Sequence, residues 1–148
     1  MHCYFSAANP SAGYPVPSSF GPQDLGLMID RAAGAGVGVL AIRILAAGAL
    51  AGTERHPLAG GTDGVLISGT DYADDERRAE RLRPIAAELG IGLAELAVRF
   101  ALSKVGLATA LVGVSAVDQI EFATRAAEAG PLPAEAVQRI VDTVVEER

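Results

Sequence analysis

The fold predicted for this chain depends most on one stretch of the sequence, GVGVLAIRILAAGALAG, residues 36–52. Its first part, residues 37–45, is a run of branched apolar residues, which predicts a strand buried on both faces. The strand runs directly into a turn of small residues, where Gly48 and Gly52 allow positive φ angles and let another backbone or a ligand come close. α/β proteins bind ligands at the carboxyl ends of parallel strands, in turns of this kind. The stretch therefore predicts a central strand and a candidate ligand site.

A second unit of the same kind follows later in the chain. Residues 108–114 predict a strand, and the helix after it is expected to end near Glu128. Ser115 and Asp118 have the spacing of a capping box at the start of that helix.

The remaining segments predict one short strand, loops and several helices. Residues 3–8 suit a short strand that enters a proline-rich loop. Residues 51–72 are glycine-rich and aperiodic, which indicates a long loop and the most mobile internal segment. Helical spacing predicts helices at about residues 22–35, 74–89 and 93–101, and a last helix that opens at Pro133.

The order of these elements, (β)-α-β-loop-α-α-β-α-α, predicts an α/β fold with parallel strands joined by right-handed crossovers. Pro84 lies inside the most charged helix, where we expect a kink or a restart. Three parallel strands cannot close a barrel, so the two outer strands are expected to present unpaired edges.

The composition suits one domain and excludes several classes of function. Half of the 148 residues are apolar, and the formal net charge of −6 argues against nucleic acid, which needs clustered Lys and Arg. No apolar run reaches the roughly 18–20 residues of a membrane span, and the first residues lack the pattern of a secretory signal. The one cysteine, Cys3, excludes an internal disulfide and is expected to be buried. We expect a cytoplasmic protein.

Three stretches resemble, in their order and spacing, the C-terminal part of an aldo-keto reductase. GVGVLAIRILAAGALAG resembles the family's seventh strand with its glycine turn, as in PLAGGLLTG. LAELAVRFALSKVGLATALVGVSAVDQIEFA, residues 93–123, resembles the following LAELALRFAL helix and the VGASxxxQLEEN motif after the eighth strand. CYFSAANPSAG, residues 3–13, resembles the sixth strand and its loop. The resemblance covers residues 3–127.

This resemblance implies a partial (β/α)8 TIM barrel, with about three parallel strands (units 6–8) and surrounding helices. Residues 1–148 are then a single C-terminal fragment. It divides into residues 1–35 (strand 6 and its helix), 36–104 (strand 7, the long loop and helices) and 105–148 (strand 8 and the last helices). The resemblance also implies NADPH as hydride donor and an aldehyde or ketone as substrate.

The family's catalytic Asp, Tyr, Lys and His lie in the first half of its barrel, and no residue of this chain matches them. We therefore predict no catalytic residue here and no activity for the chain alone. We assign the catalytic roles of the family's Tyr and His to none of the tyrosines and histidines of this chain, which are Tyr4, Tyr14, Tyr72, His2 and His56. No metal site is predicted either, because the acids of the glycine-rich loop, Asp63 and Asp71, lack EF-hand spacing.

What the resemblance leaves is the cofactor side. It places the pyrophosphate against the backbone near the first glycine turn and the adenosine at the start of the helix after the last strand. The residues so placed are Ile42, Arg43, Leu45, Ala47, Gly48, Gly113, Ser115, Ala116 and Gln119.

Several positions depart from the family pattern. Ile42 replaces the usual aromatic ring beneath the nicotinamide, and His2 replaces a glutamine that contacts its carboxamide. The usual arginine near Ser115 is absent, and Phe122 and Ala123 replace the closing Glu-Asn pair. The choice between NADPH and NADH is therefore left open.

Each of these candidate sites also has a simpler interpretation without a ligand. A glycine turn after a strand can be simple chain reversal, Gln119 can be merely solvated, and residues 74–83 read as a solvated helix face. Three functions remain: a split reductase that is inactive alone, a non-catalytic nucleotide-binding module, and a subunit that pairs its sheet edges with a partner chain supplying the missing half-barrel.

Overall fold

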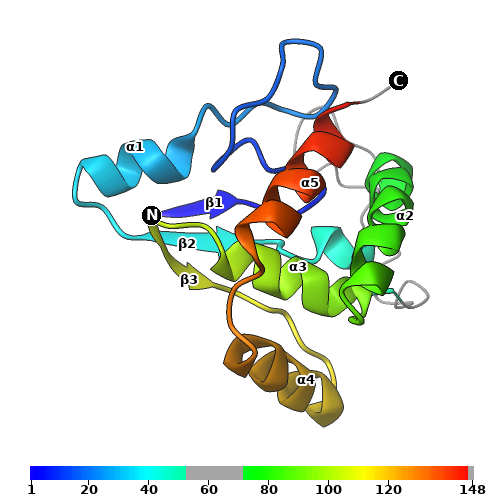
Figure 1. Cartoon of the computed structure of the whole chain (residues 1–148). Coiled ribbons are helices and arrows are strands. Elements are labelled where there is room, and N and C mark those ends of the chain that lie inside the picture. Colours follow the sequence, from blue (N-terminus) through cyan, green and yellow to red (C-terminus); the bar gives the residue numbers. More distant parts are fainter. Residues whose placement is uncertain (53–71, 147–148) are drawn as a thin grey trace.

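The structure is a computed structural model, and it describes residues 1–52 and 72–146. The elements, in chain order, are β1 (His2–Tyr4), α1 (Met28–Gly34), β2 (Val39–Ile42), the short 3-10 helix η1 (Ala46–Gly48), α2 (Tyr72–Glu88), α3 (Leu93–Leu102), β3 (Leu107–Ala110), α4 (Val117–Glu128) and α5 (Ala134–Val145) (Figure 1). This is the predicted order, with η1 added. The predictions for His56, Asp63, Asp71 and most of the loop at 51–72 lie outside the described residues.

The three strands form one parallel sheet in the order β1-β2-β3. Cys3 pairs with Ala41, and Leu40 pairs with Thr109. Within the described residues, β1 and β3 each have a strand neighbour on one side only. The fold is therefore the expected α/β arrangement, an open sheet with surrounding helices that agrees with part of a (β/α)8 barrel.

Among the described residues, one face of this sheet is covered and the other is partly exposed. Cys3, Val39 and Ala41 are fully buried, whereas Leu40 of β2 is 37% exposed and His2 of β1 is exposed. The prediction of a strand buried on both faces was therefore wrong. Its apolar run matches a complete barrel, in which side chains from other strands fill the inner face.

Helices cover the face of the sheet that carries Cys3, Val39 and Ala41. Figure 1 shows α3 and α5 on the near side of the sheet, with α1 at one end and α4 at the bottom of the view. α3 packs against β3, α2 and α4, and α2 packs against α5. At the centre of the core, Phe5 and Phe100 stack with ring centroids 5.4 Å apart, and Tyr14 lies 5.7 Å from Phe100. The apolar faces predicted for α3 and α5 are confirmed, because their spaced Leu, Ile and Val residues are buried.

All three strands are shorter than predicted. The expected strands at residues 3–8, 37–45 and 108–114 are reduced to three or four residues each. β2 ends at Ile42 because the next residue, Arg43, has a left-handed φ of 58°. Apolar residues continue past the strand ends because residues beyond the strands, such as Ile44 and Leu50, are also buried in the core. The length of the apolar run therefore overestimates the length of the strand.

α1 begins six residues later than predicted, at Met28 instead of about residue 22. The Asp24 carboxylate accepts a hydrogen bond from the backbone N–H of Gly26 at 2.7 Å. Gly26 and Leu27 then take φ angles of 59° and 55°. This side-chain turn competes with the helix and delays its start.

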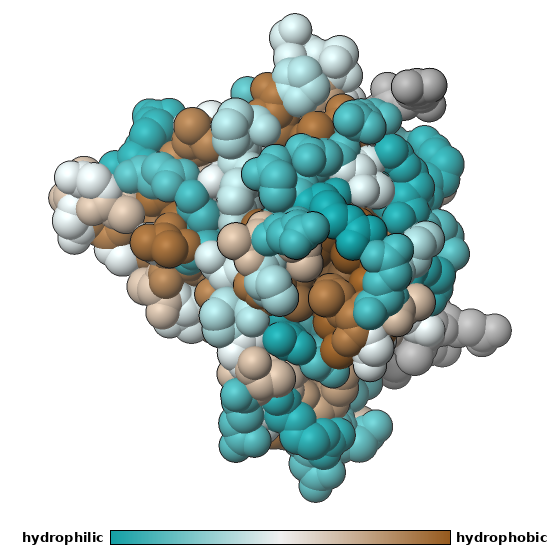
Figure 2. All heavy atoms as spheres, viewed as in Figure 1, coloured by the Kyte–Doolittle hydropathy of each residue, from teal (hydrophilic) through white to brown (hydrophobic). Residues whose placement is uncertain are grey.

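We expected a kink or a restart at Pro84. The restart does not occur, because α2 continues through this residue as one helix. Pro84 lies on the exposed side of the helix, while Leu82 and Ile85 are buried and hold both halves against the core. Figure 2 shows mostly hydrophilic residues over α2 and apolar areas toward α1. Gly90, with φ 68°, follows the end of α2 as expected.

Replacing Ser11 with Ala is expected to lower the free energy of unfolding by about 1–3 kcal/mol. The fully buried Ser11 hydroxyl donates to Asn9 Oδ1 at 2.7 Å and accepts from the Leu25 backbone N–H at 3.0 Å. Its loss leaves both groups without this partner. Urea denaturation measures the effect, and Ser18→Ala on the exposed part of the same loop should change stability by less than about 0.5 kcal/mol. Equal losses in the two variants would contradict the assignment.

Candidate functional site

A small pocket lies at the carboxyl ends of β1 and β2, the edge at which parallel sheets bind ligands. Its lining comes from β1 and the loop after it, from the turn after β2, and from the first turn of α2. The residues are Tyr4, Phe5, Ser6 and Asn9, then Arg43 and Ala46, and Asp75.

The backbone that forms this pocket is strained. Arg43, Ala46 and Ala47 have φ angles of 58°, 48° and 56°, in the left-handed region that favours glycine. Each such residue costs of order 1–3 kcal/mol, and strained backbone of this kind clusters at ligand and active sites. Gly48 completes the turn with φ 107°, which a branched residue adopts only with strain.

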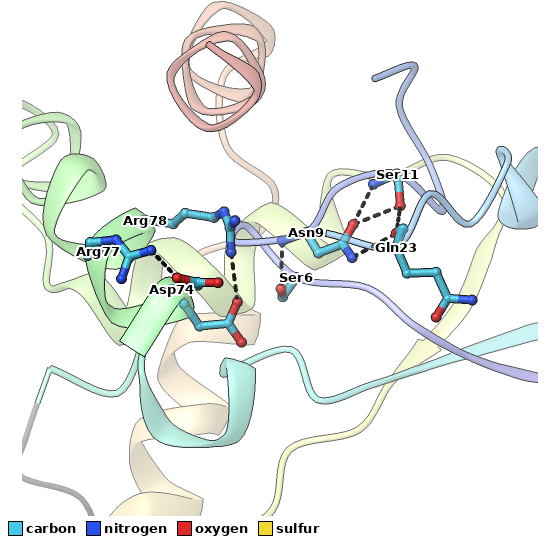
Figure 3. Close-up of polar contacts among 8 residues, drawn as sticks. Ser6, Asn9, Ser11, Gln23, Asp74, Arg77 and Arg78 are labelled. Carbon is cyan, nitrogen blue, oxygen red and sulfur yellow. Dashed lines mark hydrogen bonds and ion pairs between the residues drawn. The ribbon is translucent and has the colours of Figure 1, made fainter. Parts of the chain in front are cut away.

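Buried hydrogen bonds fix the loop on the β1 side of the pocket (Figure 3). Ser6 Oγ accepts from the Asn9 backbone N–H at 3.1 Å. The Asn9 amide donates to the Gln23 carbonyl at 3.1 Å and accepts from the Ser11 hydroxyl. These bonds hold Ser6 and Asn9 in place at the pocket wall.

Arg43 and Asp75 bring the charges. The Arg43 guanidinium lies 5.8 Å from the centre of the Tyr4 ring. The Asp75 carboxylate accepts from Arg78 Nη1 at 3.4 Å, and its side chain is 21% exposed. Burial raises the pKa of Asp75 to about 6, although the charges of Arg78 and Arg43 oppose that rise. The pocket therefore contains a carboxyl group that titrates just below neutral pH.

The burial of Asp75 predicts a pH-dependent stability. Because its pKa is higher in the folded than in the unfolded chain, protonation contributes about 2–3 kcal/mol, fully present below pH 4 and lost as the pH rises through 6. Asp75→Asn should remove this pH dependence and raise stability above pH 6. Denaturation at pH 4, 6 and 8 measures it, with Asp118→Asn on exposed α4 as the control. A wild-type slope that survives in Asp75→Asn would assign the titration to another group.

The predicted cofactor residues lie at the carboxyl ends of the neighbouring strands β2 and β3. Ile42, Arg43 and Leu45 are half-buried, and Ala47 and Gly48 belong to η1. Part of this backbone is already engaged, because the Gly48 N–H donates to the Leu45 carbonyl at 2.9 Å. The Leu45 N–H donates to no backbone carbonyl among the described residues.

At the end of β3, the predicted residues are exposed and one expectation was wrong. The capping box of Ser115 and Asp118 does not form, since Ala116 is the N-cap residue and its side chain makes no capping bond. Instead, the Gln119 side-chain carbonyl accepts from the Ser115 N–H at 2.7 Å. Gln119 is therefore not merely solvated, because its side chain closes the turn between β3 and α4. Gly113 has open space around it.

Sequence reasoning missed the polar part of the pocket. The segment at 74–83 was interpreted as a solvated face, but Asp75 is half-buried and Arg78 is only 4% exposed. A helix with an acid and a base three residues apart is too common to reveal such a site. Ser6 and Asn9 have no local signal either, because their role depends on a loop contact with Gln23.

The sequence model of the aldo/keto reductase family matches residues 26–144. The chain belongs to this family. The matched part contains both glycine-bearing turns and the strands β2 and β3, and it begins after the stretch at 3–13. A comparison with curated proteins found no match.

Membership of the aldo/keto reductases confirms the resemblance and supports an oxidoreductase origin. In the part of the chain that the structure describes, no helix is long and apolar enough to cross a membrane. Within the same residues, no three His, Cys, Asp or Glu side chains gather closely enough to hold a metal ion.

Proposed function

We propose that this chain forms the cofactor-phosphate side of an NAD(P)H-dependent aldo/keto reductase, and that aldehyde or ketone reduction needs a catalytic half outside these residues. The observation that carries the proposal is the strained glycine turn at the carboxyl end of β2, inside the part of the chain that matches the family. Ligands of parallel α/β folds bind at this edge.

The turn after β2 fits a pyrophosphate group. A Cβ built on Gly48 would have the Tyr72 hydroxyl, 3.8 Å away, as its nearest neighbour, so the glycine leaves space in front of the backbone. Ala47 is exposed and small. A bound nicotinamide cofactor would supply the hydride, and this chain would bind and orient its phosphates through backbone N–H groups such as that of Leu45.

The turn after β3 fits a phosphate less well. α4 offers uncapped N–H groups at its start, but Asp118 adds a negative charge in its first turn. The missing arginine removes a charge-assisted contact worth about 1.5–3 kcal/mol, or roughly ten- to a hundred-fold in affinity. We therefore propose weak binding, on the order of 0.1–1 mM.

Calorimetry with NADPH, NADH and adenosine 2′,5′-bisphosphate tests this proposal. Similar affinities for NADPH and NADH would fit the absence of an arginine beside Ser115. No heat with any of the three at millimolar concentration would refute a surviving cofactor site.

A second candidate function is that of a subunit that pairs with another chain. It is favoured by the open edges of β1 and β3 and by apolar side chains on that side of the molecule. Those at least 37% exposed near the uncovered face and on α4 are Leu40, Leu111, Val114, Val117 and Ile120. Mixing the chain with a polypeptide that carries five further strand-helix units should then give a one-to-one complex in sedimentation. Separate species at micromolar concentration would contradict this role.

A further inference from the structure

The pocket at the ends of β1 and β2 holds two opposite charges that backbone recognition of a cofactor does not use. Arg43 forms part of one wall and Asp75 part of another. Their charges interact, yet no ion pair joins their side chains in the described part of the chain. Arg43 lies against the Tyr4 ring instead.

Arg43 is arranged to receive a negatively charged group. Its guanidinium makes no hydrogen bond to the residues that the structure describes. It carries five N–H donors in a planar fork, which matches the oxygens of a carboxylate or a phosphate. The backbone of Arg43 has a strained φ of 58° at the start of the turn that lines the pocket. Arg43 is half-buried, and a guanidinium whose N–H groups have no acceptor is stabilised when it binds an oxyanion.

We propose that the Arg43 side chain binds an oxyanion, the carboxylate or phosphate group of a ligand, in this pocket, and that the charge state of Asp75 controls its affinity. The inference rests on the proposed function only for the end of the sheet at which a ligand enters. It adds the side chain that recognises charge and a group that regulates it.

Asp75 acts as a resident negative charge that repels the ligand when it is ionised. The charged groups that face it are Arg78, at 3.4 Å, Arg43 across the pocket, and Asp74 beside it on α2. Its pKa of about 6 places the change between pH 5 and 7. Protonation removes one negative charge from the wall, so an oxyanion should bind more tightly as the pH falls.

The test uses sulfate as the probe, because its charge is constant over this range. Sulfate is titrated into the whole chain at pH 5.5 and 7.5. The backbone N–H resonances of the pocket residues, which every variant retains, and the arginine side-chain N–H resonances are followed by NMR. The Arg43 signal should shift, and the sulfate concentration at half-saturation should be roughly tenfold lower at pH 5.5 than at pH 7.5. Formate and inorganic phosphate, compared at pH 6, then distinguish a carboxylate ligand from a phosphate ligand.

Three variants assign the site. Arg43→Gln should abolish the shift-detected binding, and Arg43→Lys should retain part of it as a point charge. Asp75→Asn should show the low-pH affinity at both pH values. Arg125→Gln, on the exposed surface of α4, is the matched control and should bind as the unaltered chain does.

Three results would overturn the proposal: binding that persists in Arg43→Gln, an unchanged pH effect in Asp75→Asn, or no saturation at pH 5.5. The first would place the anion on backbone N–H groups of the turn. Sulfate contains no nucleotide, so a chain that fails to bind NADPH can still pass this test, and a chain that binds NADPH can fail it.

Discussion

The pure chain is expected to reduce no aldehyde or ketone with NADPH above the rate in buffer. Hydride transfer to a carbonyl needs a proton donor at the developing alkoxide, held at a suitable pKa by its neighbours. The resemblance places the Asp, Tyr, Lys and His that do this in the family in the first half of the barrel, and we expect no residue of this chain to take their roles.

The structure contains a Tyr–Lys–Asp grouping, but its electrostatics oppose this role. Lys104 Nζ pairs with Asp30 at 2.7 Å and lies 5.1 Å from the centre of the Tyr14 ring. Burial and the charge of Asp30 raise the pKa of Tyr14, whereas a proton donor near neutral pH needs a lower one. Lys104 also precedes β3, at the amino end of the strand, while active sites of such folds lie at the carboxyl end.

The rate of NADPH oxidation with a panel of carbonyl compounds measures the reductase activity of the chain, with a complete aldo/keto reductase as the positive control. Turnover that purifies with the chain and disappears in Tyr14→Phe or Tyr4→Phe would refute the prediction. Addition of a polypeptide with the catalytic half should create activity where neither part has any.

Gly48→Val should abolish whatever nucleotide binding the chain retains. The φ of 107° at this position strains any branched residue, and the new side chain would occupy the space in front of the turn that a pyrophosphate needs. Calorimetry should show the affinity falling from the order of 0.1–1 mM to none that can be detected.

Gly36→Val is the matched control for Gly48→Val. Gly36 has a φ of 72° and open space around it, but it lies at the other end of β2, next to α1. It shares the backbone strain and should leave nucleotide binding unchanged. Equal binding in both variants, with folds intact by circular dichroism, would place the site away from the turn after β2.

The sequence predicted the order of elements because that order depends on local periodicity. α3 and α5 have apolar residues on one face, and these faces are the ones buried in the core. The end of α2 was predictable for a similar reason, since Gly90 allows the positive φ that closes a helix.

What the sequence could not predict depends on contacts between distant residues. The late start of α1 comes from the Asp24 turn and from Ser11, which accepts from Leu25 across 14 residues. The pocket joins the loop after β1, the turn after β2 and the first turn of α2, so no local pattern reveals Asp75 as part of it. Gln119 lies in the first turn of α4, and its bond to Ser115 follows from the shape of the turn after β3, which no local pattern predicts.

The strand register has a consequence for how the chain folds. His2 pairs with Leu40, and Leu40 in turn pairs with Thr109, so each strand must find a partner far along the chain. Closing such long loops costs entropy before any pairing repays it, and chains rich in distant contacts fold slowly, on the order of milliseconds to seconds. The helices α3 and α5 can form from local interactions within that time. We therefore expect folding to end with the sheet, and the edges at which β1, β2 and β3 pair with one another stay accessible to other chains until it does.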